Sequence, residues 1–150
     1  MMTTNGGTRI HLPENYEDII SHITPAFSDQ RGDISNILSG VDFNHIALIT
    51  SAVGSVRGNH HHPIGSQYIY VLEGAMISFS RPVESNGRSA RRVNVTAGDL
   101  LYCPPMVAHA YRFLLPTTFL SITTVQRGDG EHYEDTQPNP VITQEGILVT

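Results

Sequence analysis

The stretch GNHHHPIGSQYIYVLEG, residues 58–74, decides the fold that we predict for this chain. Three consecutive histidines are followed by turn-forming residues, an apolar run and a closing glycine. Side chains alternate between the two faces of a strand, so His60 and His62 share one face and His61 points away from them. Imidazole is the commonest metal ligand in proteins and a general base near neutral pH. The two outer histidines can therefore converge on one ion or substrate, and we expect no chemical role for His61.

A second stretch, GDLLYCPPMVAH at residues 98–109, brings a further histidine after two prolines. If the residues that follow form a strand, His109, Tyr111 and Phe113 lie on the same face. Tyr111 is then the tyrosine that we take as a candidate acid, because it accompanies a histidine.

Both stretches resemble the two motifs of the cupin superfamily. In the first motif His60, His62 and Gly74 match, and Gln67 stands where glutamate is usual. This resemblance implies an all-β, single-domain fold, a double-stranded β-helix or jelly-roll barrel, with the matching histidines in its interior.

The match to the second cupin motif is less complete. Gly98, Pro104 and His109 fall in place, but Met106 replaces a glycine and Phe113 replaces an asparagine. The two motifs together point to the fold more strongly than either does alone.

Short apolar runs separated by Gly, Pro, Asn and Ser also favour an all-β barrel or sandwich. The predicted strands are 33–38, 44–51, 67–73, 75–80, 90–96, 99–103, 107–114 and 117–125. A short helix is expected within 13–23, where acidic residues occupy the first turn. We predict an N-terminal extension over 1–28, the barrel over 29–127, and a tail or edge strand over 128–150.

Charge and composition exclude several classes of function. The chain has 14 acidic and 9 basic residues, all of the latter arginine, so lysine Schiff-base chemistry is excluded. A net charge of −5 without a basic run argues against nucleic acid as a partner. No apolar run has the length of a membrane span. A single cysteine, Cys103, fits a reducing cytoplasm.

The strand at 67–73 is largely apolar on both faces, which predicts that neither face meets bulk water. One face should line the barrel, and the other should pack on a second layer or a second subunit. We therefore expect a homodimer.

The cupin resemblance implies a ligand set of His60, His62, Gln67 and His109 around one divalent ion, with Zn, Fe, Mn and Ni all conceivable. An amide oxygen cancels none of the ion's charge, so Gln67 should hold metal more weakly than a glutamate would. The alternative is a pocket without metal, since metal-free cupins show this same glutamine.

A further resemblance is to the cupins that process nucleotide-linked keto-sugars, among them dTDP-4-dehydrorhamnose 3,5-epimerases and dTDP-sugar 3,4-ketoisomerases. The segments DQRG (29–32) and RGNHHH (57–62) carry it, with Gln67 as in the metal-free ketoisomerases. Zinc-holding relatives from capsule synthesis share the RGNH part. The resemblance implies a carbohydrate-like small-molecule substrate and proton removal next to a ketone.

Such chemistry needs a base and a group that stabilises the oxyanion. Without a metal, His60 or His62 would be the base, with Arg57, Arg112 or Tyr111 stabilising charge or donating a proton. With a metal, His45 and Tyr111 are the candidate bases. Arg57 and Arg112 can contact a diphosphate, or can equally face outward. Two other functions stay open: a three-histidine iron dioxygenase and a non-catalytic sugar- or effector-binding cupin.

Overall fold

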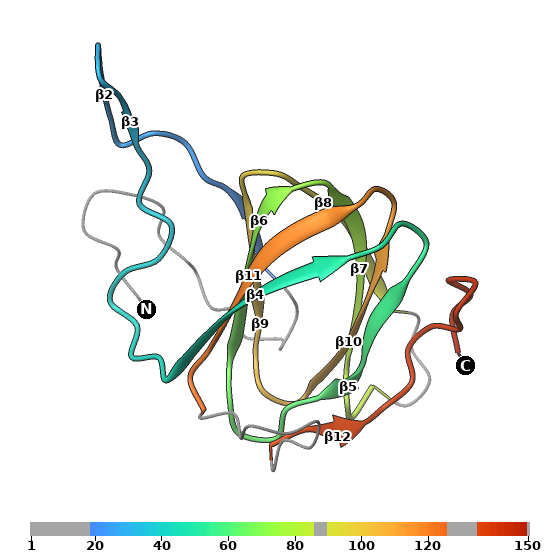
Figure 1. Ribbon diagram of the computed structural model, residues 1–150. Helices are drawn as coiled ribbons and strands as arrows, with labels where there is room; N and C mark the ends of the chain where they lie inside the picture. Colours follow the sequence, from blue (N-terminus) through green and yellow to red (C-terminus); the bar gives the residue numbers. More distant parts are fainter. Residues whose placement is uncertain (1–18, 86–89, 126–134, 150) are drawn as a thin grey trace.

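The computed structural model describes residues 19–85, 90–125 and 135–149, and every regular element in these ranges is a strand. The first sheet is antiparallel, in the order β1 (Ile19–His22), β9 (Asp99–Cys103), β6 (Gln67–Glu73), β11 (Thr117–Thr123) and β4 (His45–Ser51). The second has the order β12 (Gln137–Pro138), β5 (Val56–His61), β10 (Val107–Phe113), β7 (Ala75–Pro82) and β8 (Arg91–Thr96). Figure 1 shows the two sheets curving around a common interior. This architecture is the predicted all-β jelly-roll barrel.

The hydrophobic core lies between the two sheets and is contributed by both. Its buried members are Ile69, Val71, Met76, Val95, Leu101, Cys103, Tyr111, Phe113 and Phe119. Phe113 and Phe119 stack with ring centroids 5.8 Å apart and join the second sheet to the first. The core side chains recur at every second residue of their strands, as a pleated sheet with one inward face requires.

Each sheet is also covered on its outer face by another part of the same chain. On the first sheet, Ile23 and the segment 37–41 pack against Tyr68 and its neighbours. On the second, Val141 and Ile142 pack against the outward residues of β7 and β10. The two apolar faces of strand 67–73 are thereby explained, because one lines the core and the other meets a second layer formed by the chain itself.

Seven of the eight predicted strands are present to within two residues at each end. The exception is 33–38, where only the end of β3 (Gly32–Ile34) is a strand, paired with β2 (Phe27–Asp29) in a hairpin. This hairpin projects away from the barrel (Figure 1).

A short helix was predicted within 13–23, and the described residues from Ile19 onward are not helical. Residues Ile19–His22 form β1 and pair with β9, because the backbone of β9 offers partners that a local pattern cannot reveal. Residues 13–18 lie outside the described part of the chain. Within the described ranges, no helix is long and apolar enough to cross a membrane.

Candidate functional site

Three histidines converge at one end of the barrel: His60 near the end of β5, His62 directly after that strand, and His109 on the adjacent strand β10. His60 and His109 are direct partners across β5 and β10. The ring centroid of His60 lies 4.9 Å from that of His62 and 4.8 Å from that of His109. One nitrogen from each of the three rings lies within 4.8 Å of the others. The prediction that His60 and His62 share a face with His109 is confirmed.

A bulge in β5 sets the orientation of the histidine rings. The register between β5 and β10 shifts after His109, so that Ala110 faces Gly58 and Asn59 is the extra residue. Gly58 has φ +87° and Asn59 has φ +57°, a left-handed conformation that glycine adopts freely and asparagine tolerates. A β-carbon on Gly58 would lie 2.7 Å from the carbonyl oxygen of His109. The sequence Gly-Asn before His60 therefore permits the close approach of the two histidine strands.

Backbone carbonyls hold two of the rings. The Nδ1 of His62 lies 2.8 Å from the carbonyl oxygen of Asp135, and the Nδ1 of His109 lies 3.2 Å from that of Val107. A carbonyl only accepts hydrogen bonds, so each Nδ1 carries a proton, and in the neutral ring the lone pair is on Nε2. Both rings are buried. Each thus presents a basic nitrogen from a fixed orientation.

The first sheet contributes polar side chains to the same end of the barrel. Gln67 is the direct cross-strand partner of Cys103 on one side and of Thr123 on the other. Its Nε2 donates to Ser121 Oγ at 2.8 Å, whereas its buried Oε1 has no hydrogen-bond partner among the described residues. Gln67 is only 5% exposed, so this oxygen is a buried hydrogen-bond acceptor that a ligand inside the barrel can use.

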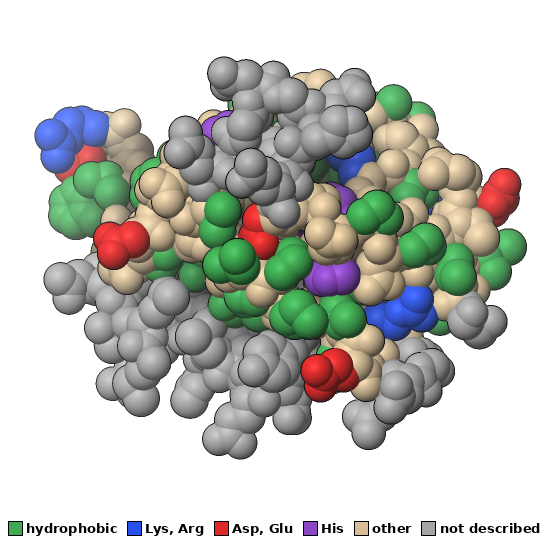
Figure 2. All heavy atoms as spheres, turned by 90° about the horizontal axis from the view of Figure 1, so that it is seen from below, with side chains coloured by type: hydrophobic (Ala, Val, Ile, Leu, Met, Phe, Trp, Pro, Cys, Tyr) green, Lys and Arg blue, Asp and Glu red, His purple; other side chains and the backbone are tan. Residues whose placement is uncertain are grey.

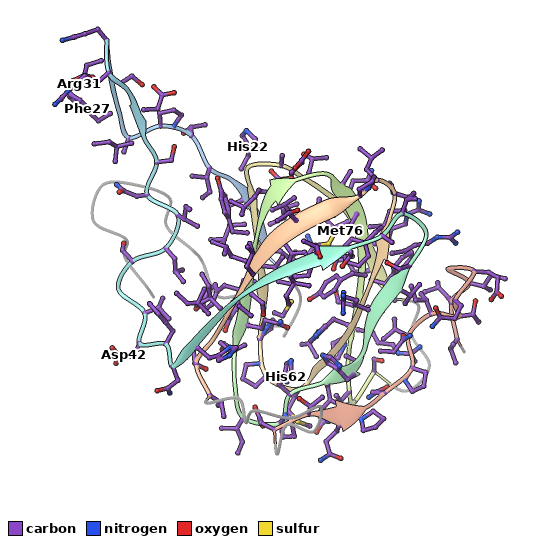
Figure 3. All side chains as sticks on the ribbon, viewed as in Figure 1. His22, Phe27, Arg31, Asp42, His62 and Met76 are labelled. Atoms are coloured by element: carbon purple, nitrogen blue, oxygen red, sulfur yellow. The ribbon has the colours of Figure 1, made fainter. Side chains whose placement is uncertain are left out.

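Tyr111 connects the two walls. Its ring stacks on His109 with centroids 5.4 Å apart, and its hydroxyl lies 3.0 Å from the sulfur of Cys103. Figure 3 shows His62 near the lower end of the barrel and Met76 near the upper end. The interior is thus apolar at one end and rich in titratable and amide groups at the other. Seen from below, histidine side chains reach the surface of this end (Figure 2).

The other predicted site residues lie farther from the histidines or on another face. His45 begins β4 on its inward face, opposite Thr123. Arg57 is the cross-strand partner of Tyr111, but its guanidinium donates to Ser51 Oγ and to the carbonyl of Thr50 on β4. It connects β5 of the second sheet to β4, an edge strand of the first.

Arg112 lies on the outer face of β10 and is not brought to the histidines. Its guanidinium donates to the carbonyl of Glu145 and packs beside Gly146 in the C-terminal segment. Its neighbours Ala108 and Ala110 share that outer face. His61 likewise contacts the C-terminal segment, with Nδ1 3.3 Å from Asn139 Nδ2.

Two residues of the site were not predicted from the sequence. Ser80 is the direct partner of His109 on β7, is 2% exposed, and its Oγ has no hydrogen-bond partner among the described residues. Asp135 contacts His62 from the C-terminal segment. Strand parity within 75–80 separates Ser80 from Phe79, but only the pairing with β10 shows that Ser80 adjoins a histidine.

These features define a class of small β-barrel proteins with an imidazole cluster in one mouth of the barrel. The chain belongs to the cupin family: the cupin domain model matches residues 47–123, which include both histidine strands. No curated protein matches the chain in sequence.

Solved structures share the fold at low sequence identity. The 3,4-ketoisomerase QdtA from Thermoanaerobacterium thermosaccharolyticum aligns with TM-score 0.65 and 18% identity over 83% of this chain and 88% of that one. The dTDP-4-dehydrorhamnose 3,5-epimerase from Elizabethkingia anophelis aligns with TM-score 0.67 and 17% identity over 87% and 79%. The rmlC epimerase from Mycobacterium tuberculosis gives 0.67 and 14% over 81% and 70%.

The histidine cluster fits a divalent ion on its chemistry. Three neutral imidazoles suit Zn, Fe, Ni or Cu, and they leave further coordination positions for substrate or water. Gln67 is the predicted fourth ligand, and its Oε1 accepts no hydrogen bond from the described residues.

Proposed function

We propose that this protein is an isomerase or epimerase that acts on a nucleotide-linked keto-sugar by removing a proton next to the carbonyl. The observation that carries the proposal is the convergence of His60, His62 and His109 inside the polar end of a cupin barrel. Proteins with this fold include QdtA in complex with TDP-4-keto-6-deoxyglucose and the 3'-monoepimerase ChmJ in complex with dTDP-quinovose.

Each step of such a reaction has a candidate group in the site. His62 or His60 removes the proton, because His62 has its Nδ1 proton engaged and its other nitrogen basic. Tyr111, buried beside His109, donates a proton or a hydrogen bond to the enediolate oxygen. The Oε1 of Gln67 accepts a hydrogen bond from a sugar hydroxyl, and His45 lies on the same inward-facing row of the first sheet.

Arg57 is the proposed contact for the diphosphate. It is exposed at the edge of the barrel and uses two of its nitrogens on β4, and its remaining donors can bind a phosphate oxygen. Arg112 has no place in this proposal, since its side chain lies on the opposite face of the sheet.

In the alternative with a bound metal, the proposed ligands are His60, His62, His109 and the Oε1 of Gln67. The base is then His45 or Tyr111, because ligated imidazole nitrogens have no free lone pair. A divalent ion there would act as a Lewis acid towards the ketone oxygen. A Gln67→Glu variant should retain more metal through dialysis, because the carboxylate adds a negative charge to the ligand set. Elemental analysis of protein purified without an affinity tag decides whether an ion is resident.

The test of the proposed activity is exchange of solvent deuterium into TDP-4-keto-6-deoxyglucose, followed by NMR. We expect exchange by the wild-type protein and a loss of about 100-fold or more in His60→Asn and His62→Asn, the size of effect that a general base supplies. His61→Asn is the matched control, because this ring is on the same strand but faces the C-terminal segment. Equal loss in all three variants, or no exchange by the wild type, would contradict the proposal.

A second candidate is a three-histidine iron dioxygenase, which the same ligand geometry favours. Oxygen consumption with Fe(II) and a diketone or phenol would support it, and indifference to oxygen would remove it. A non-catalytic sugar-binding role would instead appear as thermal stabilisation by the ligand without deuterium exchange.

We also propose a homodimer, on the basis of apolar side chains that the described chain leaves uncovered. Ile46 and Leu48 on the outer face of the edge strand β4 are 51% and 64% exposed. Phe27 and Ile34 face each other across the projecting hairpin and are likewise exposed. An isolated two-stranded hairpin is marginal in water, and an apolar patch on an edge strand favours association. Sedimentation equilibrium should give twice the chain mass of 16.5 kDa, and a monomer mass would refute the dimer.

A further inference from the structure

The C-terminal segment 135–142 is attached to the histidine strand at several points. Asn59, the extra residue of the bulge, accepts hydrogen bonds at its Oδ1 from the backbone nitrogens of Val141 and Ile142. Its Nδ2 donates to the carbonyl of Ile142, and its own carbonyl accepts from the nitrogen of Asn139. Val141 and Ile142 are buried against the second sheet. The segment is therefore held firmly along β5 and, at Val141 and Ile142, against the outer face of the second sheet.

Asp135, at the start of this segment, binds the turn that follows His62. Its two carboxylate oxygens accept from the backbone nitrogens of Ile64 at 2.8 Å and Gly65 at 2.7 Å. Gly65 permits this approach, because a β-carbon there would lie 2.8 Å from Asp135 Oδ2 and 2.8 Å from Val125 Cγ2. Hydrogen bonds from backbone nitrogens to a carboxylate are charge-assisted and short, so they fix the turn against the segment.

The same residue holds the ring of His62. The carbonyl oxygen of Asp135 accepts from Nδ1 at 2.8 Å, and Thr136 Oγ1 lies 3.4 Å from that nitrogen. Asp135 thus binds the turn through its side-chain carboxylate and the imidazole of His62 through its backbone carbonyl. Movement of the turn and rotation of the ring are coupled by this geometry.

We propose that Asp135 is a positioning residue that keeps His62 in the tautomer with the proton on Nδ1 and the lone pair on Nε2. The carboxylate sets the place of the carbonyl relative to the ring, and the carbonyl selects the proton position. The inference rests on the proposed function in treating His62 as a working member of the site. Groups that accept from the second nitrogen of a functional histidine commonly set its orientation in this way.

The experiment is a long-range ¹H–¹⁵N NMR spectrum of the histidine side chains in the 150-residue chain, with His62 assigned by its loss in His62→Asn. We expect the Nδ1-protonated pattern in the wild type and in Glu84→Ala, a control that removes an exposed carboxylate from another turn. Asp135→Ala should shift His62 towards the Nε2-protonated form. The Gly65 amide should then exchange with solvent about tenfold faster or more, because a hydrogen bond to a charged group is lost.

Two further variants keep the test decisive if Asp135→Ala does not fold. Asp135→Asn retains one oxygen acceptor and should shift the tautomer less, and Gly65→Ala should displace the intact carboxylate and shift it in the same direction. An Nε2-protonated His62 in the wild type, or an unchanged tautomer in every folded variant, would overturn the proposal. The spectrum is recorded without substrate, so its outcome is independent of the deuterium-exchange test of the proposed function.

Discussion

Gly58→Ala should destabilise the protein through the contact between its two histidine strands. Gly58 has φ +87°, and a side chain in the left-handed region costs about 1–2 kcal/mol. The added β-carbon would also lie 2.7 Å from the His109 carbonyl oxygen and 3.0 Å from Ala110 Cα, both backbone atoms that cannot rotate away. Overpacking of this kind costs about 1–3 kcal/mol. We therefore expect a total loss of about 3 kcal/mol.

Gly54→Ala is the matched control for this prediction. Gly54 has φ +78°, but a β-carbon there would meet nothing within 4 Å. The control thus carries the cost of the left-handed conformation and the same change in the unfolded chain, without the clash. The difference between the two variants isolates the strand contact.

Urea unfolding followed by far-ultraviolet circular dichroism measures both variants, since the chain has no tryptophan for fluorescence. Gly54→Ala should lower the free energy of unfolding by about 1 kcal/mol. In thermal unfolding, a loss of about 3 kcal/mol corresponds to a midpoint lower by about 6–12 °C for a chain of this size. Equal losses in the two variants would show that β5 and β10 are not held at the described separation.

Three further predictions concern stability. Burial raises the pKa of Tyr68 and of Tyr102, so the folded state favours their neutral forms. The stability linked to these neutral forms is fully present below the ordinary tyrosine pKa and is lost as the pH rises above it. The free energy of unfolding should fall as pH rises beyond about 10, and less steeply in Tyr68→Phe, in urea titrations at several pH values. Met106 has φ +61°, so Met106→Gly should be more stable than Met106→Ala by about 1 kcal/mol, and a reversed order would contradict the left-handed backbone. Arg81 donates to two carbonyls of the segment 140–149, so Arg81→Ala should accelerate hydrogen exchange in that segment and leave β6 unchanged.

Most strands could be predicted because their signals are local. Apolar alternation bounded by Gly, Pro and Asn specifies where a strand begins, where it ends and which side chains share a face. The exceptions have physical causes. Strand β5 contains the Gly58-Asn59 bulge, which interrupts the alternation, and β1 exists only because β9 supplies a partner.

Part of the candidate site could also be predicted, because strand parity is a local signal. Strand parity separates His60 and His62 from His61, and it places Arg112 on the face opposite Tyr111, so the assignment of Arg112 to the substrate conflicted with the sequence pattern itself. The role of Asp135 had no such signal, because 73 residues separate it from His62.

The amino-acid sequence alone determined which residues of each strand face inward and that histidines would accompany them, since both follow from a two-residue period along the chain. The tertiary structure alone decided which inward residues meet: His109 beside His60, Ser80 beside His109, and Asp135 behind His62. Those contacts depend on pairing between segments far apart in the chain, and no local period encodes which distant strand becomes the neighbour.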